Sequence, residues 1–394
     1  MGLPSPNDGE SKMTLQSNRF GFVIALSCGI AACGNSSDVP PGGSSNALDE
    51  QSIGEIEALA EHAVEEGIPG VSIAMLRDGQ TVTITRGVSA LGTSDPLSPE
   101  YRFRMASIAK TFVASIVLQL ASEGDVALTD TVEDVLPGQL HTNQQATLEQ
   151  LVRQQSGIFD FAEDQRLMAP YFDGNFGYSW SPDALLALAN DHPANFTPGE
   201  RFEYSNTNFL LLAMVAERVT GSTIAELVRE RIVEPLGLTA TSFETGSSME
   251  APFARGYLVG MGDPVDVTDI SGSALYGCGN LVSTPLDVAH FYRALVAGEV
   301  VSKAQLPAMF DISPSVPDAP YAMGVFRSPR TVFPCGDFIG HPGDTPGYNV
   351  IGYSSRDGHR QFAMSINSLT MDDKSGSDAA QQAYLDLAQA IACK

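Results

Sequence analysis

The stretch that decides the fold is Phe103-Arg-Met-Ala-Ser107-Ile-Ala-Lys110-Thr-Phe-Val-Ala. Residues 107–121 are apolar on nearly every face, which predicts a central buried helix. Lys110 lies inside this helix, although the chain between Lys12 and Lys303 contains no other lysine. A buried ammonium group must be paired, or its pKa falls until it becomes neutral. The sequence therefore predicts an unusual lysine at the centre of the fold.

Ser107 precedes Lys110 by three residues, so both side chains lie on one helical face. Ser107 also falls at the predicted helix start, where free N–H groups and the helix dipole favour a developing anion. A serine hydroxyl is a poor nucleophile unless a base takes its proton, and a desolvated lysine can be that base. The alternative is a capping serine beside a lysine that reaches the surface, and Ser-x-x-Lys alone does not decide between them.

Composition limits the possible functions. The chain has 394 residues, of which 43% are apolar and 18% charged, so it can bury a sizeable core. Its net charge of −25 repels phosphate backbones, and nucleic acid is excluded as an expected partner. It has no Gly-x-Ser-x-Gly elbow, no Cys-x-x-Cys and no phosphate-binding glycine loop. We therefore predict no metal and no cofactor; the single histidines without metal-ligand spacing are His62, His141, His192, His290 and His359.

The N-terminus is predicted to be a targeting segment. Lys12 and Arg19 precede an apolar run, residues 20–32, which is too short to span a membrane and suits a signal peptide over residues 1–32. The run ends in Ile30-Ala-Ala-Cys33, which resembles a bacterial lipobox and implies lipidation of Cys33. Residues 33–50 are predicted to form a flexible tether. We expect an exported protein of the cell envelope or periplasm, with the lipid as its membrane contact; the alternative is a cleaved signal that happens to contain cysteine.

The rest of the chain indicates one sheet completed by both ends. A helix over 53–66 precedes two β-rich runs, 71–76 and 81–85, joined by an Asp-Gly turn. Helical patterns dominate from about 128 to 238, and β-like runs and a closing helix follow. The predicted division is an α/β domain over 51–120 and 265–394, with a helical subdomain over 121–264 inserted into it.

Two further short motifs stand out because each occurs once. Tyr204-Ser-Asn206 lies on a turn directly before a strong helical pattern, where Asn206 is alternatively a plain helix cap. His341-Pro-Gly343 lies before a β-like run, where the alternative is an ordinary turn.

The order and spacing of Ser107-x-x-Lys, Tyr204-x-Asn and His341-x-Gly resemble those of the penicillin-recognising serine hydrolases. That family includes D-alanyl-D-alanine carboxypeptidases, class C β-lactamases and related esterases and peptidases. The resemblance covers the chain from about Ser52 to its end. It implies a β-lactamase-like α/β fold, in which an antiparallel β-sheet is flanked by helices and carries an inserted all-helical subdomain, with the site in the cleft between them.

The resemblance also implies roles for the site residues. Ser107 is expected to attack a carbonyl carbon and form an acyl-enzyme, while Lys110 and Tyr204 share the proton transfers. Which of the two is the general base stays open. Asn206 is expected to orient Lys110 and to hold the substrate amide.

The third motif is expected to bind substrate. The backbone N–H groups of Ser107 and Asp344 are expected to form the oxyanion hole beside Gly343. His341 is expected to supply polar or positive character with a charge that depends on pH. Pro342 departs from the family, which usually has a carboxylate-binding hydroxyl there, so carboxylate anchoring is weakened unless Arg327 or Arg330 replaces it.

The cysteines give one structural prediction. Cys335 precedes the His341 run, and Cys393 ends the helix that should pack on that sheet. An exported protein allows them to join, so we predict a Cys335–Cys393 disulfide that leaves Cys278 unpaired.

The function expected from the resemblance is acyl transfer to water through Ser107. A D-alanyl-D-alanine carboxypeptidase-like activity leads, followed by an esterase or another peptidase, and then by a β-lactamase. The expected substrates are a small peptide, an ester or a β-lactam. The alternative from another class is a non-catalytic binding lipoprotein, and the oligomeric state stays open.

Overall fold

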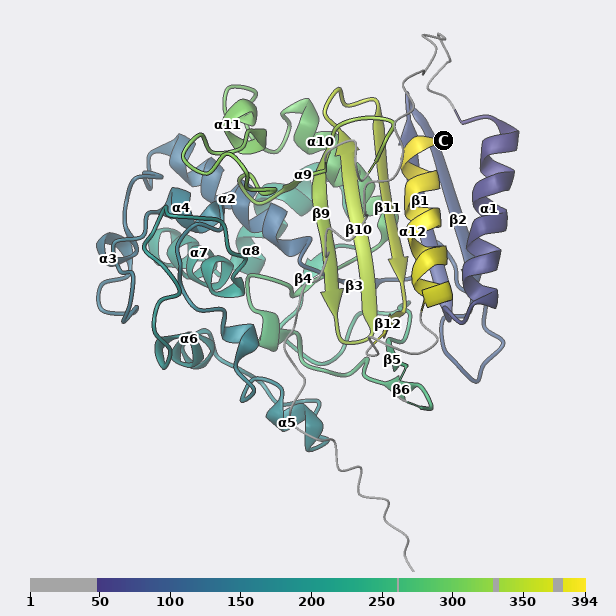
Figure 1. The fold of residues 1–394 in the computed structure, drawn as a ribbon, viewed down its shortest axis with the longest axis horizontal. Helices are drawn as coiled ribbons and strands as arrows, with labels where there is room; N and C mark the ends of the chain where they lie inside the picture. The colour runs from purple at the N-terminus through teal and green to yellow at the C-terminus, as the bar shows by residue number, and fades with distance from the viewer. Residues whose placement is uncertain (1–47, 261, 329–332, 371–377) are drawn as a thin grey trace, which may run out of the picture.

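The computed structural model describes residues 48–260, 262–328, 333–370 and 378–394. Its largest sheet has six strands in the order β2-β1-β11-β10-β9-β8, with every neighbouring pair antiparallel (Figure 1). The bounds of these strands are β1 Gly70–Arg77, β2 Gln80–Gly87, β8 Phe326–Ser328, β9 Phe338–Thr345, β10 Tyr348–Ser355 and β11 Arg360–Ile366. Because β1 pairs with β11, the beginning and the end of the described chain share one sheet.

The β1–β2 hairpin closes at the Asp-Gly turn that the sequence predicts. Asp78 and Gly79 both have positive φ, 44° and 86°, a backbone conformation that Asn, Asp and Gly adopt most readily in tight hairpins. All eight residues of β1 are buried. Strands buried on both faces need cover on both sides, and helices supply it.

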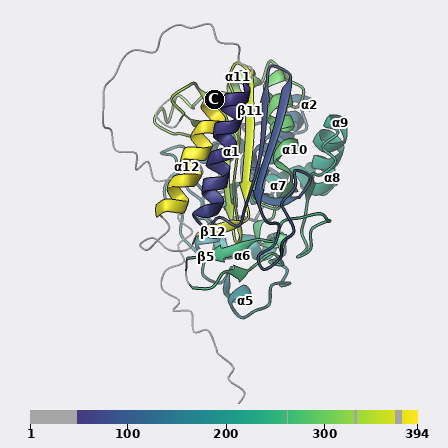
Figure 2. The same ribbon diagram turned by 90° about the vertical axis from the view of Figure 1, so that its right-hand side faces the viewer.

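The helices form a layer on each face of the sheet. Figure 2 shows α1 (Glu50–Glu65) and α12 (Asp378–Cys393) side by side on one face, with α10 (Pro285–Ala297) on the other. A disulfide joins Cys335 to Cys393 with 5.3 Å between the Cα atoms, the pair that the sequence predicts, and leaves Cys278 free and buried. This bond fastens the end of α12 to the segment that leads into β9.

The helical part packs around two long buried helices, α2 (Ala109–Glu123) and α7 (Asn206–Thr220). The rings of Phe112 in α2 and Phe291 in α10 stack with centroids 3.7 Å apart, which joins this part to the sheet. The remaining α-helices are α3 Val132–Val135, α4 Leu148–Val152, α5 Ala169–Phe172, α6 Pro182–Asn190, α8 Ile224–Val228, α9 Glu234–Leu236 and α11 Leu306–Phe310.

The described residues also form two three-stranded sheets. One has the order β3-β7-β4, with bounds Phe103–Ala106, Leu281–Ser283 and Ser242–Phe243. The other has the order β12-β5-β6, with bounds Ser368–Thr370, Tyr257–Val259 and Val265–Asp266. Residues 121–264, for which the sequence predicts a helical subdomain, also contain the two short strands β4 and β5. Both strands have only two or three residues, and their partners β7 and β12 are distant in the chain, although β5 also pairs with the nearby β6.

The predicted tether also ends too late. Leu48 is buried, and its backbone exchanges hydrogen bonds with the side chain of Gln80. Asp49 then caps α1 by accepting from the backbone N–H of Ser52. Residues 48–50 therefore belong to the folded body. The predicted signal peptide, Cys33 and the rest of the tether lie outside the described residues, and no helix in the described ranges is long and apolar enough to cross a membrane.

Candidate active site

Ser107 lies at the turn between β3 and α2. The register of β3 against β7 shifts between Arg104 and Ala106, and Ala106 has a φ of 45°, which an L-residue with a Cβ adopts at a cost. The N–H of Lys110 then donates to the Ser107 carbonyl at 3.0 Å, and α2 begins at Ala109. A strained residue thus turns the chain so that Ser107 stands at the start of the buried helix.

Lys110 is completely buried and uses all three of its N–H donors. Its Nζ atom donates to Ser107 Oγ at 3.0 Å, to Asn206 Oδ1 at 2.8 Å and to the carbonyl oxygen of Cys278 at 2.7 Å. Within the described residues it makes no ion pair. Burial lowers the pKa of Lys110 to about 8, so both its charged and its neutral forms are accessible near neutral pH.

A carboxylate that the sequence analysis did not identify lies behind Asn206. The Nδ2 atom of Asn206 donates to Asp160 Oδ2 at 2.9 Å, and the N–H of Ala162 donates to Asp160 Oδ1 at 2.9 Å. Burial raises the pKa of the Asp160 carboxyl to about 6. No local motif marks Asp160, and Cys278 contributes only its backbone, so neither partner had a recognisable signal in the sequence.

Tyr204 lies just before α7 and points its ring at Lys110. The Lys110 Nζ atom is 4.9 Å from the ring centroid, and the Tyr204 and His341 rings are 6.1 Å apart. Burial raises the pKa of Tyr204 well above its ordinary value, although the nearby Ser107 hydroxyl opposes the rise. The Tyr204 hydroxyl is buried and has no hydrogen-bond partner among the described residues. It is a neutral phenol beside the Ser107 hydroxyl, and it does not belong to the lining of the cavity described below.

His341 in β9 is fully buried. Its Nδ1 atom lies 2.5 Å from the Pro342 carbonyl and so carries the proton, which leaves Nε2 to accept from the Tyr321 hydroxyl at 3.1 Å. Burial, together with the positive charge of Lys110, lowers the pKa of His341 to about 3. Of the polar or positive character expected of His341, only the polar part fits, because burial and the ammonium group of Lys110 both disfavour a positive charge on its ring.

Strand β9 passes directly over the end of β3, just before the start of α2. A Cβ atom on Gly343 would lie 2.8 Å from the Met105 carbonyl oxygen and 3.0 Å from the Ala106 Cβ, so only glycine fits here without displacing main chain. Strand β8 pairs with β9 only as far as Gly340. From His341 onward β9 therefore pairs with β10 alone, which leaves a free edge where Pro342 is tolerated.

Arg327, one of the two arginines considered for carboxylate binding, does not meet this site. Arg327 lies in β8, forms an ion pair with Asp337 at 3.3 Å, and does not line the cavity described below. Arg330 lies outside the described residues.

A cavity opens beside Ser107 with about 780 Å³ of empty space, part of it open to solvent. Its apolar walls include Leu167, Met168, Ile270 and Leu275, and its polar lining includes Ser107, Asn206, Asp344 and Arg104.

The two charged residues of the lining differ in how they are held. Burial raises the pKa of Asp344 to about 6, and its carboxyl accepts from Asn349 Nδ2 at 2.6 Å. The Arg104 guanidinium donates to the carbonyls of Ser247 and Thr268, but its Nε has no partner in the described ranges. The lining is thus mostly apolar, and the partner-free Nε of Arg104 is itself buried.

The structure brings the residues singled out in the sequence into one place. Ser107, Lys110 and Asn206 share hydrogen bonds, Tyr204 and His341 lie beside them, and Gly343 packs against the nucleophile's strand. In the described part of the chain, no group of three or more His, Cys, Asp or Glu side chains is arranged to hold a metal ion.

Comparisons with known proteins agree with this geometry. The beta-lactamase family profile matches residues 56–386. Protein flp of Staphylococcus aureus is 30% identical over 229 residues, which cover 55% of this chain but only 44% of flp. The putative penicillin-binding protein PbpX of Bacillus subtilis is 25% identical, covering 77% of this chain and 71% of its own length.

Among solved structures, the D-stereospecific amidohydrolase of a Streptomyces species superposes with a TM-score of 0.73 at 32% identity, covering 82% of this chain and 95% of that protein. The fold, the site geometry and the family match lead to one conclusion. The chain belongs to the beta-lactamase family and is a serine hydrolase of the superfamily that includes the penicillin-binding proteins.

Proposed function

We propose that this protein hydrolyses short amides or peptides whose acyl residue has the D configuration, through an acyl-enzyme on Ser107. The observation that carries the proposal is the 3.0 Å contact between Lys110 Nζ and Ser107 Oγ, made by a lysine with a pKa of about 8. The likeness to a D-stereospecific amidohydrolase over most of both chains supports the substrate class.

The proton transfers follow from the contacts of the free site. Neutral Lys110 accepts the Ser107 proton as Oγ attacks the carbonyl carbon, and the C–O bond of the tetrahedral intermediate forms. The Tyr204 hydroxyl, which has no partner of its own in the described structure, donates its proton to the leaving nitrogen and regains one from Lys110. Water then cleaves the ester by the reverse sequence. In this scheme Lys110 is the base of acylation.

The developing oxyanion needs donors that are already in place. The backbone N–H groups of Ser107, at the start of α2, and of Asp344, on the free edge of β9, are the proposed pair. Each such donor contributes about 3–4 kcal/mol to the transition state.

The leaving group is proposed to be uncharged, as in a simple amide. Pro342 has no hydroxyl, His341 is neutral and the cavity walls are largely apolar, so nothing here matches the usual carboxylate anchor. The second candidate is a D-alanyl-D-alanine carboxypeptidase-like activity. The presence of Arg104 in the cavity lining favours it, because a buried guanidinium attracts a carboxylate.

A substrate panel tests both candidates. D-amino acid amides, D-alanyl-D-alanine peptides, short nitrophenyl esters and nitrocefin are compared, with Ser107→Ala as the control. We expect the D-amide to have the highest kcat/KM and its L enantiomer at least 10-fold less. Preference for the D-alanyl-D-alanine peptide supports the second candidate, while turnover surviving in Ser107→Ala contradicts the assigned nucleophile. If no acylating probe labels wild-type protein, the non-catalytic binding role replaces both.

We also propose that the protein is exported and lipid-anchored through Cys33. The Cys335–Cys393 disulfide supports export, because such bonds persist in oxidising compartments. Metabolic labelling with a radioactive fatty acid in a bacterial host tests the anchor. Label in the wild type that is lost in Cys33→Ala is the expected result, and equal labelling of both contradicts it.

A further inference from the structure

We propose that Asp160 is a positioning residue of the active site, which fixes the amide of Asn206 and thereby the orientation and proton affinity of Lys110. The inference rests on the proposed function and adds a residue that does not touch the reacting atoms. It is drawn from a continuous chain of buried contacts that runs from Asp160 through Asn206 and Lys110 to Ser107.

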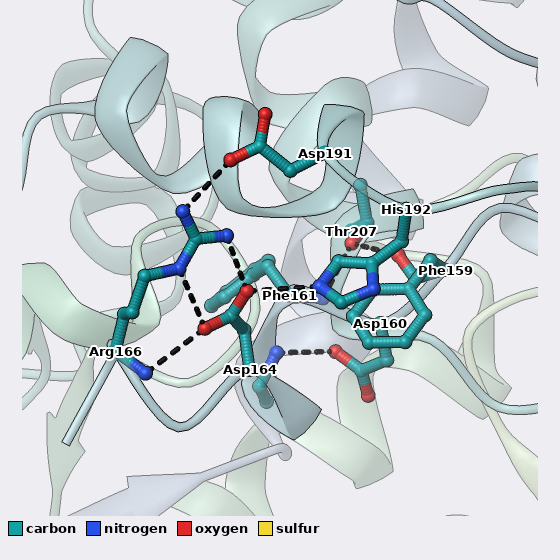
Figure 3. A network of polar contacts seen from close by, with 9 residues as sticks. Phe159, Asp160, Phe161, Asp164, Arg166, Asp191, His192 and Thr207 are labelled. Atoms are coloured by element: carbon teal, nitrogen blue, oxygen red, sulfur yellow. Dashed lines mark hydrogen bonds and ion pairs between the residues drawn. The ribbon is translucent and has the colours of Figure 1, made fainter.

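The loop that carries Asp160 is fastened to the start of α7. Thr207, the neighbour of Asn206, donates from Oγ1 to the Phe159 carbonyl at 2.7 Å and accepts from the Phe161 N–H at 3.0 Å. Figure 3 shows Thr207 beside these two residues, with the Asp160 carboxylate below them. The two hydrogen bonds between Thr207 Oγ1 and the main chain on either side of Asp160 thus hold Asp160 next to Asn206.

The carboxylate determines which way the Asn206 amide points. An ionised carboxylate only accepts, so Asn206 must turn its NH₂ group to Asp160 and its carbonyl oxygen to Lys110. The opposite orientation would place an NH₂ donor against an ammonium donor. Asp160 therefore makes Asn206 an acceptor for Lys110, and this bond aims Nζ at Ser107.

The charge of Asp160 also acts on Lys110. Burial lowers the pKa of Lys110, and the carboxylate of Asp160 opposes that fall. The other titratable groups of this buried cluster are neutral over the working range, because burial raises the pKa of Tyr204, Tyr321 and Cys278 and lowers that of His341. The remaining charge is on Glu163, on the loop of Asp160, whose effect is to raise the pKa of Asp160. Asp160 is thus the carboxylate that balances the ammonium group through the neutral amide.

Asp160→Asn tests the proposal, and Asp164→Asn is the matched control. Both carboxylates lie on one loop and are similarly buried, at 7% and 8% exposure, but Asp164 binds Arg166 and His192 rather than Asn206. The readout is the rate at which a fluorescent phosphonate labels Ser107, measured from pH 5 to pH 10. We expect Asp160→Asn to slow labelling on the order of 100-fold and to move the acidic limb down by about one pH unit. Asp164→Asn should leave both unchanged.

A second readout is independent of activity. The chain has five lysines, so the Lys110 Nζ resonance can be followed by ¹⁵N NMR of lysine-labelled protein. We expect its pKa to fall in Asp160→Asn and to return to the wild-type value in Asp160→Glu, which keeps the charge. Circular dichroism checks that each variant is folded.

The outcomes separate the two proposals. If the wild type is not labelled, the proposed function fails, and the lysine titration still tests Asp160. If the wild type is labelled and Asp160→Asn has the same labelling rate, acidic limb and Lys110 pKa, the positioning role of Asp160 is overturned while the proposed function stands. If Asp164→Asn reproduces the shift, the effect belongs to the loop and the proposal is also overturned.

Discussion

Asp160 and Asp164 lie four residues apart on one loop, and each belongs to a cluster of charged residues. The two clusters differ in how their charges are paired. In one, Asp160 and Lys110 are buried and face each other only through the amide of Asn206. In the other, Arg166 pairs directly with Asp164 at 2.5 Å and with Asp191 at 2.7 Å, and its side chain is 54% exposed (Figure 3).

The pKa values follow from this difference. Direct pairing lowers the pKa of Asp164 far below its ordinary range, so that group stays charged and holds the loop. Asp160 and Lys110 are buried but do not form a direct ion pair. Burial therefore moves their pKa values toward each other, to about 6 and about 8. An ion pair fixes charge, whereas an intervening amide leaves both groups able to exchange a proton near neutral pH.

The largest effect is expected when one cation is removed from each cluster. Lys110→Met deletes the base and should lower kcat/KM on the preferred substrate by about 100- to 10,000-fold. Arg166→Met removes the exposed cation and should change kcat/KM by less than about threefold, because it does not reach the site. Steady-state kinetics on both variants, with circular dichroism as a folding check, decides the matter. Equal losses would mean that both clusters serve the same purpose.

The pH dependence of wild-type activity tests the role of Lys110 as the base. The base must be unprotonated to accept the Ser107 proton, and burial holds the pKa of Lys110 at about 8. Activity should therefore rise with pH up to about 8 and fall roughly 10-fold per unit below it, giving on the order of a 100-fold loss at pH 6. A kcat/KM profile measures this limb. A flat profile between pH 6 and pH 9 contradicts the role of Lys110 as the base.

A third test concerns the wall behind the buried cluster. Gly343→Ala places a methyl group 2.8 Å from the Met105 carbonyl, so β9 must move away from Ser107. We expect a loss of about 1–3 kcal/mol in the free energy of unfolding, together with reduced acylation. Gly54→Ala in α1 is the matched control. It meets no atom within 4 Å and should stabilise the helix by about 0.5–1 kcal/mol. Denaturant unfolding that ranks the two variants the other way contradicts the crowding argument.

The smallest effect is expected at the exposed cluster. Asp164→Asn should cost about 1 kcal/mol at pH 7, since its partner Arg166 is half exposed and solvent screens the pair. The folded pKa of Asp164 is depressed, so its contribution is present above the unfolded value near 3.9 and is lost as pH falls below it. The stability curve of the variant should therefore be flatter below pH 4. Thermal unfolding at several pH values measures this, and an unchanged slope contradicts it.

The sequence predicted the elements of this site that form short motifs. Ser107, Lys110, Tyr204 and Asn206 stand at fixed short spacings, and an amphipathic or apolar helix follows each pair, so local pattern was sufficient. Asp160 lay beyond reach, because its role depends on a partner 46 residues away in the chain.

The sequence could not predict features that arise from tertiary contacts. The loss of charge on His341 follows from burial, which no local motif reports. The short strand β4 exists only through its pairing with β7, which follows in the chain after the predicted subdomain has ended. The disulfide could be predicted from the sequence because Cys335 and Cys393 both lie in segments expected to be near one sheet.

The positive φ of Ala106 has a consequence for the orientation of the neighbouring Ser107 hydroxyl. Glycine at this position would relieve about 1–2 kcal/mol of backbone strain, but it would also enlarge the freedom of the unfolded chain by a comparable amount. The exchange of alanine for glycine would therefore hardly change the thermal stability. What would change is the spread of directions in which the neighbouring Ser107 hydroxyl points, so we expect Ala106→Gly to lower turnover more than stability.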